Sequence, residues 1–422
     1  MGTVFGVFAN GWLTERFGHR RVILVSLVFM TAFIFIPFFA PSIQVLLVGQ
    51  ILCGIPWGIF ATMGPSYSSE VCPTALRGYL TAYVNMCWAI GQFVAAGVLQ
   101  GLVSNTTEWG YRIPFAVQWA WPVPLFILTY LAPDSPWWLV RKGRIEDAEK
   151  AVKRLSSKSE EMNSTLTVAM MIHTNNLEQS LDTKSSYLDC FKGSNLRRTE
   201  IACCALAGQI MSGSSFAYSP TYFFSQAGLS TSDDYKLGLG GTAIAFLGTA
   251  SSWFLINKFG RRTIYLAGIG TLTCLLLIIG GLSYPAEHNN SVKYGQAAVT
   301  LCWLGTYSTT IGPLAFTIAA EMSATRLRAQ TIALARNAYN IINIVSVVVE
   351  PYLINPTEAN LKGKTAFFWF ATAFLTFVWA FFRLPETKGR TYEELDLLFE
   401  KEVSAIKFKG YKIDAYEEQA DA

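Results

Sequence analysis

Long apolar runs separated by short polar segments make up most of the chain. Several runs reach the roughly 20 residues that an α-helix needs to cross the hydrocarbon core of a bilayer. The pattern predicts about eleven membrane-spanning helices, and the runs cover approximately residues 1–14, 22–40, 43–67, 78–103, 111–132, 199–228, 236–256, 263–283, 294–319, 329–352 and 364–384. The first run is shorter than a complete span. The sequence therefore predicts an all-α membrane protein.

The one long polar segment lies between Trp138 and Arg198 and divides the chain into two halves. Within it, apolar residues recur at helical spacing over 145–155, which predicts a short amphipathic helix. In the polar C-terminal tail, Thr391 and Glu394 match a capping box, which predicts a second such helix. We expect four regions, namely an N-terminal helix bundle over 1–136, a central loop over 137–198, a C-terminal six-helix bundle over 199–384 and a tail over 385–422.

Short charged motifs occur once in each half. The segments Glu70–Arg77 and Glu321–Arg328 share the pattern E-x-x-x-T-x-L-R, and each interrupts two apolar runs. Further motifs repeat at a similar offset, with Gly18 answered by Gly260 and Pro133-Asp-Ser by Pro385-Glu-Thr. A repeat this long is typical of secondary transporters built from two homologous halves.

Composition supports a bilayer environment and argues against other classes of protein. Hydrophobic residues make up 52% of the chain and charged residues only 15%, against roughly 25% charged in soluble domains. The net charge of +4 is small, so nothing favours a nucleic-acid partner. The 8 cysteines show no C-x-x-C spacing, which argues against a zinc site or a disulfide framework. We find no nucleophile–base or metal constellation, and we therefore expect no catalytic residues, no metal, no cofactor and no enzyme activity.

The distribution of Lys and Arg among the loops predicts orientation. Loops at 15–21, 133–160, 192–198, 257–262 and 322–328 carry most of these residues, whereas the alternate loops carry few. The positive-inside rule then places the central loop, both ends of the second half and the tail in the cytoplasm of a multi-pass plasma-membrane protein.

Several motifs resemble those of the sugar-porter family of the major facilitator superfamily. They lie at Gly11–Arg21, Pro65–Gly78, Pro133–Leu139, Gly260–Arg262, Gly312-Pro313, Glu321 with Arg328, and Pro385–Arg390. The run Ala320–Asn340 resembles fungal α-glucoside, or maltose-type, permeases. The resemblance implies two pseudo-symmetric six-helix bundles, a sugar site between them at mid-membrane, and alternating access. Because the family has twelve spans, we also expect that the first span is missing here and that the chain is N-terminally truncated.

The resemblance and the repeat together predict a charge latch on the cytoplasmic face. Charge pairs at the ends of moving helices would hold one state closed and separate in the other. The alternative is that these charges only fix the orientation in the membrane. The predicted latch residues are Glu15, Arg16, Arg20, Glu70, Arg77, Arg261, Glu321 and Arg328.

A sugar site needs amide groups that match hydroxyls and aromatic faces that stack on the ring. Arg336 is the most informative candidate, because a guanidinium in mid-span is costly unless it is paired or hydrated. Asn85 occupies the position equivalent to Arg336 in the first half, and Ser215, Tyr218 and Tyr222 should follow Gln209 on one helix. Polar side chains inside spans often only join neighbouring helices, and this alternative stays open. The predicted binding residues are Asn85, Gln209, Ser215, Tyr218, Tyr222, Phe316, Arg336 and Asn340.

The resulting prediction is a carrier that moves an α-glucoside such as maltose by proton-coupled alternating access. Its expected partners are a sugar, a proton and the lipid bilayer. The proton-coupling residue is not identified, because Glu350 lies at an outer end of its span and Glu70 and Glu321 lie at inner ends. The alternatives are a hexose facilitator or symporter of the same family, a sugar sensor that does not transport, and an inactive fragment.

Overall fold

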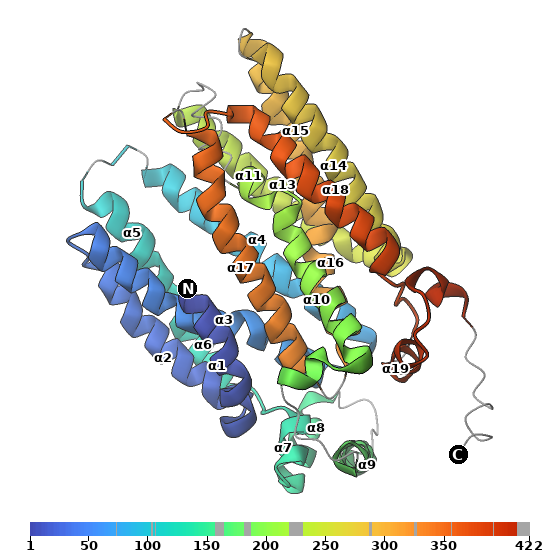
Figure 1. Ribbon diagram of the computed structural model, residues 1–422. Helices are drawn as coiled ribbons and strands as arrows, with labels where there is room; N and C mark the ends of the chain where they lie inside the picture. Colours follow the sequence, from blue (N-terminus) through green and yellow to red (C-terminus); the bar gives the residue numbers. More distant parts are fainter. Residues whose placement is uncertain are drawn as a thin grey trace. The chain divides into compact units, whose positions relative to one another are not determined.

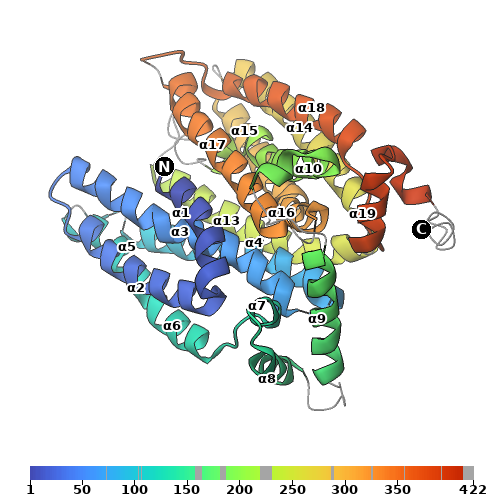
Figure 2. The same cartoon turned by 60° about the horizontal axis from the view of Figure 1, so that its bottom comes forward.

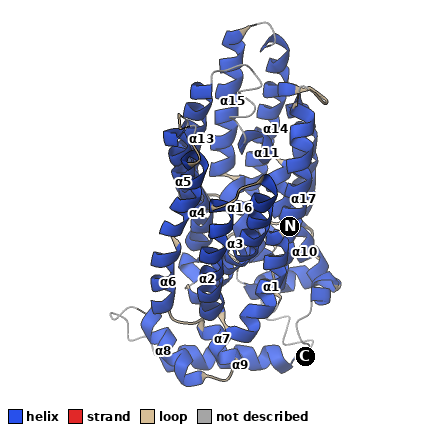
Figure 3. Ribbon diagram, turned by 90° about the vertical axis from the view of Figure 1, so that its left-hand side faces the viewer, coloured by secondary structure: helices blue, strands red, loops and turns tan. Residues whose placement is uncertain are grey.

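The computed structural model describes residues 1–411 except positions 73, 103, 106, 157–163, 181–186, 219–230, 287–288, 325–326, 356 and 391. Over these residues the chain is helical and contains no strand (Figure 3). Seven helical segments in this part of the chain are long and apolar enough to cross a membrane. These observations confirm the predicted all-α membrane class.

Helix packing divides the chain into two units. The first comprises Met1–Tyr187 and Arg326–Asn340, and the second comprises Leu188–Thr325 and Ile341–Ala422. This division joins the central segment as far as Tyr187 to the first bundle, and it divides one long helix between the units. The sequence predicts different regions, with a separate loop over 137–198 and a bundle over 199–384, and those boundaries stay predictions.

The bundle of the first unit consists of helices α1 to α6, which are drawn from blue to cyan in Figure 1. They are α1 (Gly2–Phe17), α2 (His19–Phe38), α3 (Ile43–Val71), α4 (Thr74–Leu102), α5 (Trp109–Val117) and α6 (Pro122–Leu131). The predicted span at 111–132 is interrupted, because a short 3-10 helix, η1 (Gln118–Ala120), lies between α5 and α6. Helix α3 packs against both α1 and α2.

Glycines allow α1 and α3 to approach closely. Gly2 and Gly6 on α1 face Gly54 and Gly58 on α3, so each helix carries a G-x-x-x-G pattern at the contact. A methyl group added at Gly58 would lie 2.9 Å from the backbone nitrogen of Val7. Small residues at such positions let helix backbones meet in a membrane, where the hydrophobic effect does not drive helices together.

A buried hydrogen bond also joins these two helices. The Nδ2 atom of Asn10 donates to the Oγ1 atom of Thr62 over 2.8 Å, and both side chains are buried. Apolar contacts then fix α2 against α3 through two small clusters, one around Val22 and Met63 and one around Ile34 and Cys53. The three helices therefore form the packed centre of the first unit.

Three further helices of the first unit follow the bundle. They are α7 (Pro136–Arg141), α8 (Ile145–Leu155) and α9 (Ser164–Ser180), which pack on one another (Figure 2). The predicted amphipathic helix over 145–155 is confirmed as α8, with Ala148 and Val152 buried against Trp138 of α7. Contacts between α3 and α7 attach this group to the bundle.

The second unit is built around α14, which packs against α15 and α18. Its helices are α10 (Gly193–Met211), α11 (Ser214–Tyr218), α13 (Thr231–Lys258), α14 (Arg261–Ala286), α15 (Asn290–Thr309), α16 (Ile311–Met322), α17 (Arg328–Ile354), α18 (Thr365–Arg383) and α19 (Tyr392–Glu400), with short 3-10 helices η2 (Tyr187–Phe191), η3 (Lys362–Lys364) and η4 (Ala405–Gly410). The start of α17 belongs to the first unit. Helix α19 confirms the predicted tail helix, and its Leu395, Leu398 and Phe399 are buried.

Two predicted spans of this half are broken helices. The run 294–319 is divided at Thr310, where α15 ends and α16 begins. Pro313 lies in the first turn of α16, where its missing N–H is tolerated. The expectation that Ser215 and Tyr218 continue the helix of Gln209 is wrong, because α10 ends at Met211 and Gly213 has a φ of +90°. A glycine tolerates this left-handed conformation, which ends the helix before α11 begins.

Candidate functional site: two charge clusters and a buried polar face

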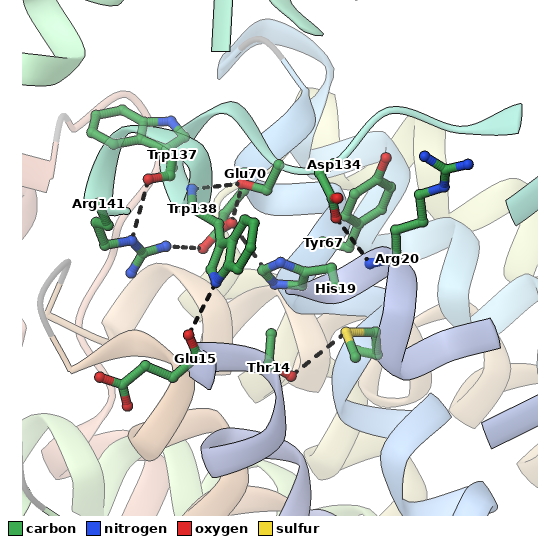
Figure 4. Close-up of polar contacts among 12 residues, drawn as sticks. Thr14, Glu15, His19, Arg20, Tyr67, Glu70, Asp134, Trp137, Trp138 and Arg141 are labelled. Atoms are coloured by element: carbon green, nitrogen blue, oxygen red, sulfur yellow. Dashed lines mark hydrogen bonds and ion pairs between the residues drawn. The ribbon is translucent and has the colours of Figure 1, made fainter. Parts of the chain in front are cut away.

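Glu70 lies at the centre of a polar cluster in the first unit (Figure 4). Near the end of α3, its Oε1 atom accepts a hydrogen bond from Nη2 of Arg141 over 2.8 Å. Its Oε2 atom accepts a hydrogen bond from the hydroxyl of Ser135 and lies 3.8 Å from Nε2 of His19. Ser135 is also the N-cap of α7, and Arg141 is the last residue of that helix. The short helix α7 therefore brings both partners to one carboxylate.

The electrostatics of this cluster favour an ionised Glu70. Burial alone would raise the pKa of the Glu70 carboxyl, but nearby His19 and Arg141 and the Ser135 hydroxyl outweigh it. The pKa of Glu70 therefore lies below its ordinary value. The side chain of Glu70 is only 17% exposed, whereas that of Arg141 is 49% exposed. Because Arg141 is half-exposed, the pair is partly screened by water.

Asp134 provides a second connection in the same cluster. Its Oδ1 atom accepts a hydrogen bond from the backbone N–H of Arg20 over 3.1 Å. The guanidinium of Arg20 donates to the carbonyl oxygen of Tyr130 and lies 5.0 Å from the centre of that ring. The start of α2 is thus attached to the end of α6 and to the turn that follows it.

Glu321 has the corresponding position in the second unit. Near the end of α16, its Oε1 atom lies 2.9 Å from Nη2 of Arg261, and the Nε atom of Arg261 lies 3.2 Å from both of its oxygens. The hydroxyl of Thr387 donates to Oε2 over 2.5 Å. Both charged side chains are largely buried, at 16% exposed for Arg261 and 19% for Glu321.

The two clusters share most of their contacts. Thr387 takes the place of Ser135, and Glu386 takes that of Asp134, since its Oε1 atom accepts a backbone N–H over 2.7 Å, here that of Arg261. Arg262 donates to the carbonyl oxygen of Phe381, as Arg20 does to that of Tyr130. Three features differ. His19 stands in the first half where Arg261 stands in the second, and the N–H that reaches Glu386 lies one residue earlier in its motif than the N–H that reaches Asp134. The pair of Glu70 with Arg141 has no equivalent among the described contacts of Glu321. The repeat found in the sequence therefore reflects a repeated arrangement of side chains.

The remaining predicted latch residues lie near the ends of helices. Glu15 and Arg16 are exposed at the end of α1, where Arg16 lies over the rings of Trp12 and Phe17. The backbone carbonyl of Glu15 accepts a hydrogen bond from the indole of Trp138 over 3.1 Å. Arg328 is half-buried at the first turn of α17. The side chain of Arg77 lies outside the described part of the structure.

Arg336 is the most distinctive of the predicted binding residues. It is 7% exposed, and its guanidinium lies 4.4 Å from the ring centre of Tyr339 and 5.6 Å from that of Trp88. Trp88 lies on α4 one turn after Asn85, which is half-buried. Aromatic rings stabilise a desolvated cation by about 2 kcal/mol. The contact therefore brings the guanidinium to the same helix as Asn85.

The other predicted binding residues have diverse environments. Gln209 is buried, and its Nε2 atom donates to the carbonyl oxygen of Gly312 over 2.7 Å, which joins α10 to α16. Ser215 accepts a hydrogen bond from Ser346 over 2.6 Å, which joins α11 to α17. Phe316 is buried on α16, and Asn340 is buried on α17. Tyr222 and the side chain of Tyr218 lie outside the described residues.

Arg141 and Asn337 belong to these sites but are not among the residues that the sequence predicts. Arg141 follows the Pro133–Leu139 motif without being part of it, and only the fold brings it to Glu70. Asn337 is 3% exposed, and neither of its amide atoms has a hydrogen-bond partner within the described part of the chain. The sequence does contain a signal for Asn337, because it lies beside Arg336 and three residues before Asn340 in the same predicted span.

Comparisons with known proteins agree with this arrangement. The family model for "Sugar (and other) transporter" matches residues 1–399. The maltose permease MAL61 of Saccharomyces cerevisiae is 40% identical over 423 residues, covering 98% of this chain and 68% of that protein. The α-glucosides permease MPH3 of the same species is 39% identical over 422 residues, covering 98% of this chain and 70% of that protein.

A solved structure shares the fold. It is the proton:xylose symporter XylE, bound to 6-bromo-6-deoxy-D-glucose, with a TM-score of 0.80 and 21% identity, covering 94% of this chain and 87% of that chain. The family match covers nearly all of the described residues and includes both charge clusters. The chain thus belongs to the sugar transporter family, as a multi-pass membrane protein that resembles yeast α-glucoside permeases and has the fold of a major facilitator superfamily symporter.

Proposed function

We propose that the chain moves an α-glucoside such as maltose across the plasma membrane together with a proton, by alternating access. The observation that carries this proposal is the 40% identity over 98% of the chain to a maltose permease. The family itself accounts for sugar transport, whereas the choice of sugar and the coupling to protons are the proposed parts. Coupling is supported by the proton symport stated for XylE, which has the same fold.

The polar face around Arg336 supports binding of a sugar. Arg336, Asn337 and Asn340 lie within two turns of α17 and are all more than nine-tenths buried. Guanidinium and amide groups supply the donors and acceptors that sugar hydroxyls need. A buried guanidinium inside a membrane-spanning helix is an expensive structural element. Substrate binding would explain why this position tolerates it.

The two charge clusters support a role as latches. Each joins the start of one helix to the end of another and to a following segment, through a carboxylate that is less than one-fifth exposed. On the orientation that the loop charges predict, both clusters lie on the cytoplasmic side. Breaking one cluster would weaken the state that is closed toward the cytoplasm.

Uptake of labelled maltose, with external pH recorded, tests this proposal. Yeast cells that lack their own α-glucoside carriers and express the chain should accumulate maltose and raise the external pH when maltose is added. Arg336→Ala should abolish accumulation. Arg336→Lys should retain part of it, because lysine keeps the positive charge but lacks the planar guanidinium with its paired donors. Uptake of glucose without uptake of maltose would overturn the proposed substrate, and wild-type accumulation by Arg336→Ala would overturn the role of Arg336.

A further inference from the structure

Glu350 is a buried carboxylate that none of the roles above uses. It lies on α17 within the membrane-spanning segment Gln330–Ile354, and it is 5% exposed. The sequence places it near one end of the span, which suggests contact with water. In the structure its side chain is instead buried, so the carboxyl group is shielded from water.

One strong contact positions this carboxylate. The indole Nε1 of Trp369 on α18 donates to the Oε2 atom of Glu350 over 2.6 Å, and Trp369 is itself 4% exposed. The Oε1 atom is also buried, and it has no hydrogen-bond partner among the described residues. Oε2 of Glu350 therefore accepts a hydrogen bond, whereas Oε1 has no partner among the described residues.

This asymmetry fits a carboxylic acid better than a carboxylate. An ionised carboxylate accepts hydrogen bonds at both oxygens, whereas a neutral acid accepts at one oxygen and carries its proton on the other. Trp369 supplies the donor for one oxygen, and a proton on Oε1 would remove a negative charge that no described cation compensates. Among the described residues, an ionised group here would have neither a donor at Oε1 nor a cation beside it, which is costly inside a membrane protein.

The groups that the structure describes around Glu350 do not offer a compensating charge. Ser346, one turn earlier on α17, is hydrogen-bonded to Ser215 of α11. On the side of α18, Thr365 is buried one turn before Trp369. The charged residues that follow Glu350 most closely along the chain are Glu358, Lys362 and Lys364, and none forms an ion pair with Glu350 in the described structure. Lys364 instead lies 4.7 Å from the ring centre of Tyr284.

We propose that Glu350 is a proton-binding site of the transport cycle. It holds a proton while its surroundings are closed, and it releases the proton when the local structure opens and water reaches Oε1. Trp369 acts as a positioning residue that holds the carboxyl group in place. This proposal rests on the proton coupling proposed above and names a group that carries the proton.

The test compares Glu350→Gln with the unaltered chain and with Glu358→Gln as a matched control, because Glu358 is exposed beyond the end of the same helix. Two readouts are needed, namely accumulation of labelled maltose against its gradient and exchange of maltose at equal concentrations on both sides. Glutamine keeps the acceptor for Trp369 but cannot exchange a proton. We expect exchange within about twofold of the unaltered chain, accumulation reduced more than about tenfold, and loss of the maltose-induced pH change.

The outcomes separate the two proposals. Accumulation and proton uptake by Glu350→Gln at the level of the unaltered chain would overturn the role of Glu350 while leaving proton coupling intact. Maltose transport by the unaltered chain without any pH change would overturn proton coupling, and this proposal with it. If Glu350→Gln does not reach the membrane, Trp369→Phe decides, since removal of the indole donor should shift the pH dependence of accumulation by about one pH unit. An unchanged pH profile would then overturn the proposal.

Discussion

Arg141 and Glu70 form an ion pair of 2.8 Å across 71 residues of sequence. The carboxylate comes from the end of α3, and the guanidinium comes from the end of α7, a helix of 6 residues that starts at Pro136. Because Arg141 is half-exposed, water can reach one side of the pair. The contact is therefore suited to opening and closing.

Removal of Arg141 should favour opening toward the cytoplasm. Arg141→Ala leaves Glu70 with His19 and Ser135, so we expect the equilibrium to shift by about 1 kcal/mol, or roughly fivefold. The shift can be measured as the labelling rate of a cysteine introduced on the cytoplasmic side, in a background without reactive cysteines. Arg144→Ala is the matched control, because Arg144 pairs with Asp147 within its own segment at 2.7 Å. Equal labelling of both variants would count against the latch.

The pH dependence of stability should reveal the ionised state of Glu70. A carboxylate whose folded pKa is depressed contributes stability above its unfolded pKa, and that contribution is lost as pH falls through the folded pKa. The difference in melting temperature between the unaltered protein and Glu70→Gln should thus be constant from about pH 6 to 7.5 and shrink below about pH 4.5. Thermal unfolding in detergent at several pH values measures it. A difference that grows with acidification would contradict an ionised Glu70.

In the second unit, the shape of the cation should matter as well as its charge. Arg261 reaches both oxygens of Glu321 through Nε and Nη2, which a lysine cannot reproduce. Arg261→Lys should therefore reduce the initial rate of maltose uptake by about two- to tenfold, with the amount of protein in the membrane unchanged. A rate equal to that of the unaltered chain would show that charge alone suffices at this position.

Asn337 should affect substrate affinity. Its amide is buried without a partner in the described residues, and loss of one hydrogen bond to a sugar hydroxyl costs about 1 kcal/mol or more. Asn337→Ala should raise the KM for maltose about fivefold or more. Gln296→Leu is the control, because both hydrogen bonds of that buried amide are made within the protein, to Ile279 and Ser283. The control should lower thermal stability and leave KM unchanged, whereas an unchanged KM for Asn337→Ala would assign Asn337 to packing.

The glycine contact between α1 and α3 should be sensitive to a single methyl group. Gly58→Ala should lower the free energy of unfolding by about 1–3 kcal/mol, because the added group meets backbone atoms of α1. Gly91→Ala on α4 adds the same group where no atom lies within 4 Å, so it should be neutral or stabilising by up to about 1 kcal/mol. Melting temperatures of the two purified variants provide the comparison. Equal melting temperatures would show that the helices separate easily.

Much of the fold was predictable because the bilayer enforces a simple rule. Helices that cross it must be apolar and long, so the spans that became α17 and α18 were located to within two residues. Breaks such as those at Thr310 and Gly213 were not predicted, since an apolar run does not record where the backbone turns. Hydropathy shows which segments lie in the membrane, but it does not show where a helix is interrupted.

In the charge clusters, the sequence identified the central residues but not all of their partners. The repeat identified Glu70 and Glu321 as equivalent residues, and both are indeed central to their clusters. The partner of Glu70 was not predictable, because Arg141 has no counterpart in the repeated motif and reaches Glu70 only through the fold of α7. The sequence also offered no reason to choose Glu350 as the proton-coupling residue, because it lies near the end of its span. Position along a helix does not determine which side chains are buried.

The close approach of α1 and α3 restricts how the first unit can deform. Backbones that touch through glycines cannot slide past one another without colliding, because there are no long side chains to reorient. The buried bond between Asn10 and Thr62 locks the same pair in register. These two helices should therefore move as one rigid body, which leaves bending of the first unit to places where its helical backbone is already interrupted, such as η1 between α5 and α6.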